Sequence, residues 1–173
     1  MDWQAVIHEH GPLVWKTAFR LLSNEADTSD CFQEVFVAAV RISRQENVRN
    51  LPALLNRLAT HKAIDLLRRR RLTPQTTLSM ECDDCPDMSF NPERSAQNNE
   101  LSDRLRQALI TLPDLEAQAF CLQVFNELSY RQIAAQLHVK TGYVGTLISR
   151  AKEKLQRLFP AAVNEEIWGK TYE

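Results

Sequence analysis

Glycine and uninterrupted apolar runs are scarce in this 173-residue sequence. Only 4 glycines occur, and no apolar run approaches the roughly 20 residues that a membrane-spanning helix requires. Regular alternation of β-branched and polar residues, the pattern typical of strands, is also rare. The N-terminus, MDWQAVIHEH, has acids and histidines where a signal peptide has basic residues and then an apolar block. We therefore expect an all-α, cytoplasmic protein without membrane insertion.

Cysteine is sparse as well, with 4 residues in the chain. Cys31 and Cys121 fall within helical patterns, where a free cysteine packs as a small apolar residue. Cys82 and Cys85 form a single CxxC pair among acidic neighbours. A structural zinc site needs four ligands, and a reactive thiolate needs electropositive surroundings. We therefore expect no disulfide framework, no metal and no cofactor, and interpret the CxxC pair as exposed thiols.

Neither sign of charge dominates the chain as a whole, because the net charge is −1. Residues 1–72 carry 11 basic and 8 acidic side chains, residues 73–100 carry 1 and 6, and residues 101–173 carry 9 and 8. This distribution excludes a protein that binds phosphates over its whole surface. The acidic middle segment is rich in proline and poor in apolar residues, so it is predicted to be a linker between two helical parts.

The first part shows three helical patterns. One begins near Trp3, and Pro12 is expected to interrupt it or to start a helix. The second is expected to begin at Asp27 or Thr28, since either residue is a suitable N-cap. It carries one apolar stripe at helical spacing. The third covers residues 51–70.

The second part ends in two short helical patterns separated by a few residues, between Leu128 and Leu155. Ser129 and Gln132 have the spacing of a capping box, and Thr141 is a suitable cap for the last helix. The outer face of that helix is polar and basic. This pattern predicts a helix-turn-helix, which inserts its second helix into the major groove of DNA. An ordinary helical hairpin with a solvated charged face is the alternative.

Longer stretches resemble one protein family. The run LPDLEAQAFCLQVFNELSYRQIAAQLHVKTGYVGTLISRAKEKL resembles region 4 of bacterial extracytoplasmic-function (ECF) sigma factors, in the sigma-70 superfamily. The runs AFRLLSNEADTSDCFQEVFVAAVR and LLNRLATHKAIDLLRRRR resemble region 2. The resemblance implies two small helical domains joined by a flexible acidic linker. Region 2 would comprise residues 1–72, the linker 73–100, region 4 residues 101–159, and a C-terminal tail 160–173.

The resemblance also implies a function and a set of partners. The chain would direct promoter-specific transcription initiation without a catalytic step of its own. It would bind core RNA polymerase at the β′ clamp and the β flap, bind promoter DNA, and be controlled by an anti-sigma factor.

Within region 2, the resemblance assigns residues to two surfaces. The polymerase-binding residues are Asp30, Gln33, Glu34 and Phe36. For Asp30, a favourable position at the positive end of its helix is the alternative explanation. The residues assigned to the −10 element are Asn47, Asn50, Arg57, His61, Lys62, Arg68 and Arg69. The cations among them suit backbone phosphates, which position a protein without specifying sequence.

Within region 4, the resemblance assigns the outer face of the last helix to the −35 element. The assigned residues are Lys140, Thr141, Tyr143, Thr146, Ser149, Arg150, Lys152 and Lys154. Arg150 has the fork geometry that binds a guanine edge, and Lys140 and Lys154 suit phosphates.

Two other classes of protein stay open at this point. A stand-alone helix-turn-helix regulator would leave the region 2 resemblance unexplained. A thiol oxidoreductase based on Cys82 and Cys85 would lack a paired general acid and base.

Overall fold

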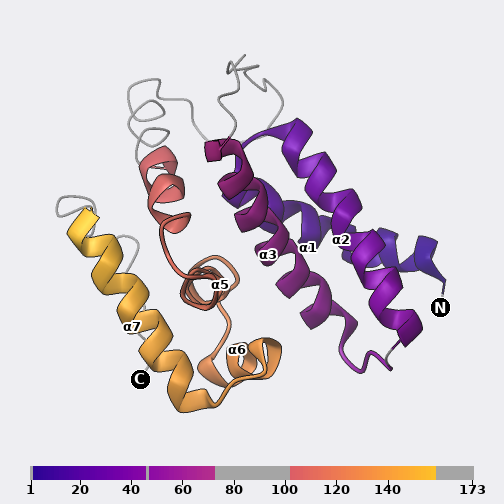
Figure 1. Ribbon diagram of the computed structural model, residues 1–173. Helices are drawn as coiled ribbons and strands as arrows, with labels where there is room; N and C mark the ends of the chain where they lie inside the picture. The colour runs from indigo at the N-terminus through magenta and orange to yellow at the C-terminus, as the bar shows by residue number, and fades with distance from the viewer. Residues whose placement is uncertain (1, 46, 73–101, 159–173) are drawn as a thin grey trace, which may run out of the picture.

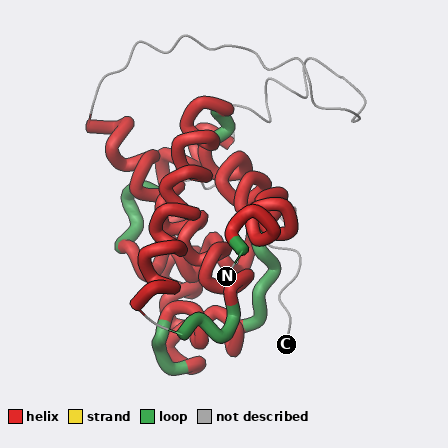
Figure 2. Tube along the Cα trace, turned by 90° about the vertical axis from the view of Figure 1, so that its right-hand side faces the viewer, coloured by secondary structure: helices red, strands yellow, loops and turns green. Residues whose placement is uncertain are grey.

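The computed structural model describes residues 2–45, 47–72 and 102–158. Its labelled helices are α1 (Trp3–Leu22), α2 (Glu25–Gln45), α3 (Leu51–Leu72), α5 (Asp114–Val124), α6 (Tyr130–Leu137) and α7 (Thr141–Leu158). Residues 102–109 are helical too, and no strand occurs within the described ranges (Figures 1 and 2). The expected all-α class is therefore confirmed. None of these helices is long and apolar enough to cross a membrane.

The helices α1, α2 and α3 pack against one another and form the N-terminal lobe. The apolar stripe of α2 behaves as its periodicity predicts, because Val35, Phe36 and Ala39 are buried. Phe32 also belongs to this stripe, and its ring lies 4.9 Å from that of Phe36, centroid to centroid. The stripe thus fixes which face of α2 turns inward and leaves the opposite face exposed.

The first helix corrects the expectation for Pro12. It runs without interruption from Trp3 to Leu22, with Pro12 inside it. Proline removes one backbone hydrogen bond, to the carbonyl of His8, but both residues are exposed, so water can satisfy that carbonyl. Gly11 just before it is buried, and a side-chain carbon there would lie 3.4 Å from Cζ of Phe32. The glycine therefore lets α1 and α2 approach closely.

The start of α2 also differs from the prediction. The helix begins at Glu25 rather than after Asp27 or Thr28. The Asn24 side chain accepts a hydrogen bond from the backbone nitrogen of Asp27 at 3.0 Å, and the Thr28 hydroxyl donates to the Asn24 carbonyl at 2.7 Å. Asparagine caps helices as well as aspartate or serine does, and it lies three residues earlier than Asp27.

The helix-turn-helix is confirmed, and it has its own apolar core. The capping box at the start of α6 is complete, with Ser129 and Gln132 bonding to each other's backbone. The sequence predicts Thr141 as the N-cap of the last helix, so that the helix would begin at the next residue. In the structure, α7 begins at Thr141 itself. A separate cluster holds the two helices to α5. Its buried members are Ala119, Leu122, Ile133, Ala134, Val144, Leu147 and Ile148.

The C-terminal lobe, residues 102–158, is docked on the N-terminal lobe. A single cluster of buried residues joins Val14, Leu21 and Leu55 of the first lobe to Leu109 and Phe120 of the second. In Figure 1, α3 lies between the other two helices of its lobe and the pair α5 and α6. The predicted linker, the C-terminal tail and the Cys82–Cys85 pair lie outside the described residues. The three boundaries between the four predicted segments remain predictions.

Candidate polymerase and promoter interfaces

The residues assigned to polymerase binding share one groove between α2 and α3. Asp30, Gln33 and Glu34 line a groove of about 610 Å³, together with Val37, Ala38, Arg41, Ile42, Lys62 and Leu66. Asp30 and Gln33 are exposed, and Val37 keeps half of its surface open to solvent. Phe36 points the other way and is buried. An exposed valine beside acids and an amide is the mixture of an apolar anchor and polar rim that protein interfaces use.

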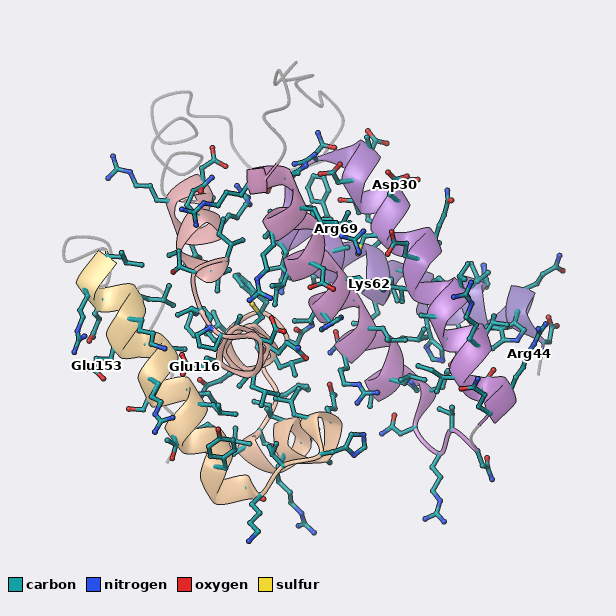
Figure 3. All side chains as sticks on the ribbon, viewed as in Figure 1. Asp30, Arg44, Lys62, Arg69, Glu116 and Glu153 are labelled. Carbon is teal, nitrogen blue, oxygen red and sulfur yellow. The ribbon has the colours of Figure 1, made fainter. Side chains whose placement is uncertain are left out.

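Two cations assigned to the −10 element point into the same region. Lys62 Nζ lies 2.9 Å from Glu34 Oε2, and Arg69 Nη1 lies 4.0 Å from Glu34 Oε1. Figure 3 shows Lys62 and Arg69 on α3 where it faces α2. Beneath this pair, burial and the nearby Glu34 raise the pKa of the Cys31 thiol to about 12. Cys31 is therefore a packing residue, as its helical pattern predicts.

The remaining −10 cations of α3 turn toward the C-terminal lobe. Arg57 Nη1 donates to the carbonyl of Gln136 at 3.0 Å. Arg68 Nη2 donates to the carbonyl of Leu112 at 2.8 Å, and its Nη1 contacts Asp114. The seven assigned residues therefore do not form one surface. The four cations divide between two sides of α3 because positions 57 and 68 lie about 100–140° around the helix from positions 62 and 69.

Three other −10 residues lie apart from both groups. Asn50 caps α3, because its Oδ1 accepts a hydrogen bond from the backbone nitrogen of Ala53 at 3.0 Å. Asn47 is exposed in the segment before it. His61 Nδ1 lies 3.5 Å from Asp65 Oδ2 on the same helix. Asn47 and Asn50 are thus exposed at the end of the loop before α3, away from the cations of that helix.

The −35 residues are grouped on the exposed side of α7. Tyr143, Thr146, Ser149 and Arg150 are all exposed, as are Lys140 and Thr141 just before them. Their apolar neighbours Val144 and Leu147 are buried. Side chains of these types on one open helical face are suited to base edges and phosphates in a major groove.

Lys154 has a different environment from the rest of that set. Its Nζ lies 2.7 Å from Oε2 of Glu116, whose side chain is only 8% exposed. A buried carboxylate needs a cationic partner, so this pair holds α7 to α5 (Figure 3 labels Glu116 beside α7). Lys152 is half-buried.

The structure adds two residues beside the −35 face that sequence reasoning did not include. Tyr130, the first residue of α6, is 38% exposed. Its Cε2 would lie 3.6 Å from a side-chain carbon at Gly145, so the ring rests against α7. Arg131 next to it is exposed. In a helix-turn-helix, the first helix crosses the DNA backbone. This rule, applied to the sequence, would have indicated Tyr130 and Arg131 as candidate contacts.

Sequence reasoning also missed the polar contacts between the lobes. Thr17 and Asn56 are buried in the N-terminal lobe, and Asn126 of the C-terminal lobe donates to both. The Asn126 Nδ2 atom lies 3.1 Å from Thr17 Oγ1 and 2.7 Å from Asn56 Oδ1. The three residues are far apart in the chain, so no local pattern signals their association.

Comparison with known protein families gives two matches. Residues 6–73 match the model of sigma-70 region 2, and residues 102–155 match the model of sigma-70 region 4. The matches contain the groove between α2 and α3 and the exposed face of α7, respectively.

Two curated relatives span most of the chain. The ECF RNA polymerase sigma factor SigE of Mycolicibacterium smegmatis is 30% identical over 155 residues, which cover 90% of this chain and 60% of SigE. The ECF RNA polymerase sigma factor SigW of Bacillus subtilis is 28% identical over 154 residues, which cover 83% of this chain and 81% of SigW. This chain thus spans only three fifths of the length of SigE.

Two solved structures have a similar fold. CnrH, in complex with the cytosolic domain of CnrY, has a TM-score of 0.58 at 23% identity, over 91% of this chain and 87% of CnrH. RpoE of Bartonella quintana, in complex with the anti-sigma factor NepR, has a TM-score of 0.55 at 20% identity, over 92% and 98%. Because regions 2 and 4 both match in order and the relatives carry them together, the chain belongs to the sigma-70 family of RNA polymerase sigma factors, in its ECF group.

Proposed function

We propose that this protein directs core RNA polymerase to a set of promoters, with region 2 bound to polymerase and the −10 element and region 4 bound to the −35 element. The observation that carries the proposal is the pairing of two surfaces in one chain: a groove with Asp30, Gln33 and Glu34, and an exposed recognition face on α7. A stand-alone helix-turn-helix regulator would need only the second. The first surface and the region 2 match therefore argue against that alternative.

The same proposal covers partners and location. The protein acts in the cytoplasm, where it meets polymerase and DNA, and it contributes binding rather than a catalytic step. The β′ clamp binds at the α2–α3 groove and the β flap binds region 4. An anti-sigma factor controls the free protein, as the fold shared with a sigma factor bound to NepR supports.

Run-off transcription tests the proposal directly. Purified core polymerase is incubated with genomic promoter fragments, with and without this protein, and the RNA 5′ ends are mapped. Initiation at defined start sites that depends on the protein supports the proposal. Core binding without any defined start, under conditions where a known sigma factor initiates, would contradict it.

Replacing Gln33 and Glu34 together by alanine is expected to weaken binding to core polymerase. Truncation costs more than about 1 kcal/mol at the minority of interface residues that dominate binding. If Gln33 and Glu34 are such residues, the dissociation constant should rise at least about tenfold. Fluorescence anisotropy of the labelled protein with core polymerase measures it. Because Gln33 is exposed and Glu34 is partly exposed, the free protein should remain folded.

The matched control is Arg41→Ala, which changes an exposed cation in the same groove. A loss for Arg41→Ala as large as that for the double variant would mean that any truncation in the groove weakens binding, and the specific assignment of Gln33 and Glu34 would be wrong.

A further inference from the structure

A pocket of about 740 Å³ lies between the two lobes, and we call it the interlobe pocket. One wall comes from α1, from the end of α2 and from residues 48–57, which lead into α3. The other wall comes from residues 125–128 and from α6. Its volume is in the range of small-molecule sites in proteins, about 300–1,000 Å³. The pocket is therefore large enough to enclose a ligand of metabolite size.

Positive charge dominates the lining of the interlobe pocket. Four cations line it and one carboxylate does, so with neutral histidine the lining has an excess of three positive charges. These residues are Lys16, Arg20, Arg49, Arg57 and Glu127. A hollow lined by one sign of charge concentrates ions of the opposite sign. The ligand that complements this lining is an anion.

The four cations have hydrogen-bond donors to spare. Lys16 and Arg49 are exposed, and neither has a hydrogen-bond or ion-pair partner among the described residues. Arg20 uses its Nη1 atom for the Phe125 carbonyl, and Arg57 uses its Nη1 atom for the Gln136 carbonyl. A guanidinium has five N–H donors, so both arginines keep most of theirs. Such donors bind phosphate oxygens well.

The rest of the lining suits the body of a larger molecule. Leu13, Ile42, Val48, Leu54 and Phe125 supply apolar surface.

Amide side chains complete the wall on the side of the C-terminal lobe. Asn126 and Gln136 line the pocket, and the side-chain oxygen of each is buried without a hydrogen-bond partner among the described residues. A buried acceptor without a partner is costly, so this wall favours a ligand that brings N–H donors. The amino group of a nucleobase is such a donor, and amides are common readers of base edges.

We propose that the interlobe pocket binds a free nucleoside diphosphate. Lys16 and Arg49 bind the phosphates, and the base lies against Phe125 with its edge toward Asn126 and Gln136. A diphosphate carries a charge of about −3 near neutral pH, which matches the excess charge of the lining. This site goes beyond the proposed function and does not rest on it.

Isothermal titration calorimetry of the full chain without polymerase tests the site, with guanosine 5′-diphosphate and adenosine 5′-diphosphate as probes. At least one probe is expected to bind at one site per chain. It should bind at least about tenfold more tightly than inorganic pyrophosphate, because the base adds contacts that pyrophosphate lacks. Free guanosine and adenosine should not bind detectably. The bound diphosphate should also raise the melting temperature, since it binds only the folded chain.

Replacing Lys16 and Arg49 together by glutamine is expected to weaken binding of the diphosphate about tenfold or more, because charge-assisted hydrogen bonds to phosphate are lost. The matched control is the double change Arg41→Gln and Arg44→Gln. It alters the net charge equally at exposed positions that do not line the pocket, and Figure 3 labels Arg44 near the end of α2. The control should bind the diphosphate as the wild type does.

Ala135→Phe tests the pocket without a change in charge. Ala135 is exposed on α6 and lines the pocket, so a larger side chain there fills space that the base needs. This variant should lose binding of the diphosphate and keep the weaker binding of pyrophosphate. All variants are required to keep the wild-type circular dichroism spectrum.

Three results would overturn the proposal. The first is a wild-type protein that binds neither diphosphate. The second is an equal loss in the two double variants, which would mean that binding follows overall charge. The third is tight binding of single-stranded oligothymidylate that Ala135→Phe abolishes and that neither diphosphate displaces, which would assign the pocket to a DNA strand.

Discussion

Replacing Phe120 by alanine is expected to lower the free energy of unfolding by about 3–5 kcal/mol, the range for removing a fully buried phenylalanine from a core. The Phe120 side chain has no exposed surface and belongs to the cluster that spans both lobes. Its removal leaves a cavity at the junction of the lobes, so both lobes should lose stability together. Urea unfolding followed by circular dichroism measures the change.

Leu158→Ala is the control, because Leu158 is 52% exposed at the end of α7. A change at such a surface position is expected to stay within about 0.5 kcal/mol. The urea unfolding curve of Phe120→Ala could instead show two transitions, with only one of them shifted from its position in the wild type. That result would show that the lobes unfold independently. The docking described above would then contribute little to stability.

Replacing Arg150 by alanine is expected to weaken binding to the −35 duplex by about 1–3 kcal/mol, or roughly 5- to 150-fold, if its guanidinium binds a guanine edge. Arg150 is exposed on the recognition face of α7 beside Ser149. The duplex is chosen from the start sites mapped by run-off transcription, and anisotropy titrations at fixed salt measure the affinity. The loss should be confined to one base position, and duplexes altered there should bind both proteins equally.

Arg157→Ala serves as the matched control for Arg150. It removes the same side chain from the last turn of the same helix, where the guanidinium pairs with Glu153 at 2.6 Å. An exposed pair of this kind contributes little to stability. If both variants lose the same affinity on every duplex, Arg150 contributes charge only and its assignment to a base is wrong.

Sequence reasoning predicted helices well wherever the signal lies within a few turns. The capping box of Ser129 and Gln132 and the buried stripe of α2 are both observed. Each depends on side chains within about four residues of each other, which is the reach of local backbone hydrogen bonds. The misplaced start of α2 came from choosing Asp27 over Asn24, two residue types of nearly equal capping strength.

The resemblance assigned residues to each candidate site, but it did not predict which other residues those side chains contact. The resemblance placed Glu34 and Lys62 in different sets, whereas in the structure they form an ion pair at 2.9 Å. It likewise placed Lys154 among phosphate ligands, and in the structure this lysine pairs with buried Glu116. Both pairs join different helices, so their partners follow from helix packing and not from spacing along the chain.

Periodicity and capping along the chain determined that this protein is helical, which face of α2 is apolar, and where the helix-turn-helix begins. Two ordered regional patterns were enough to indicate the family. Only the tertiary structure decided that the lobes share a core and that region 4 occupies Arg57 and Arg68. The physical reason is distance along the chain: those contacts join residues 79 and 46 positions apart. Such contacts arise from the fit of whole helix surfaces, which no short stretch of sequence encodes.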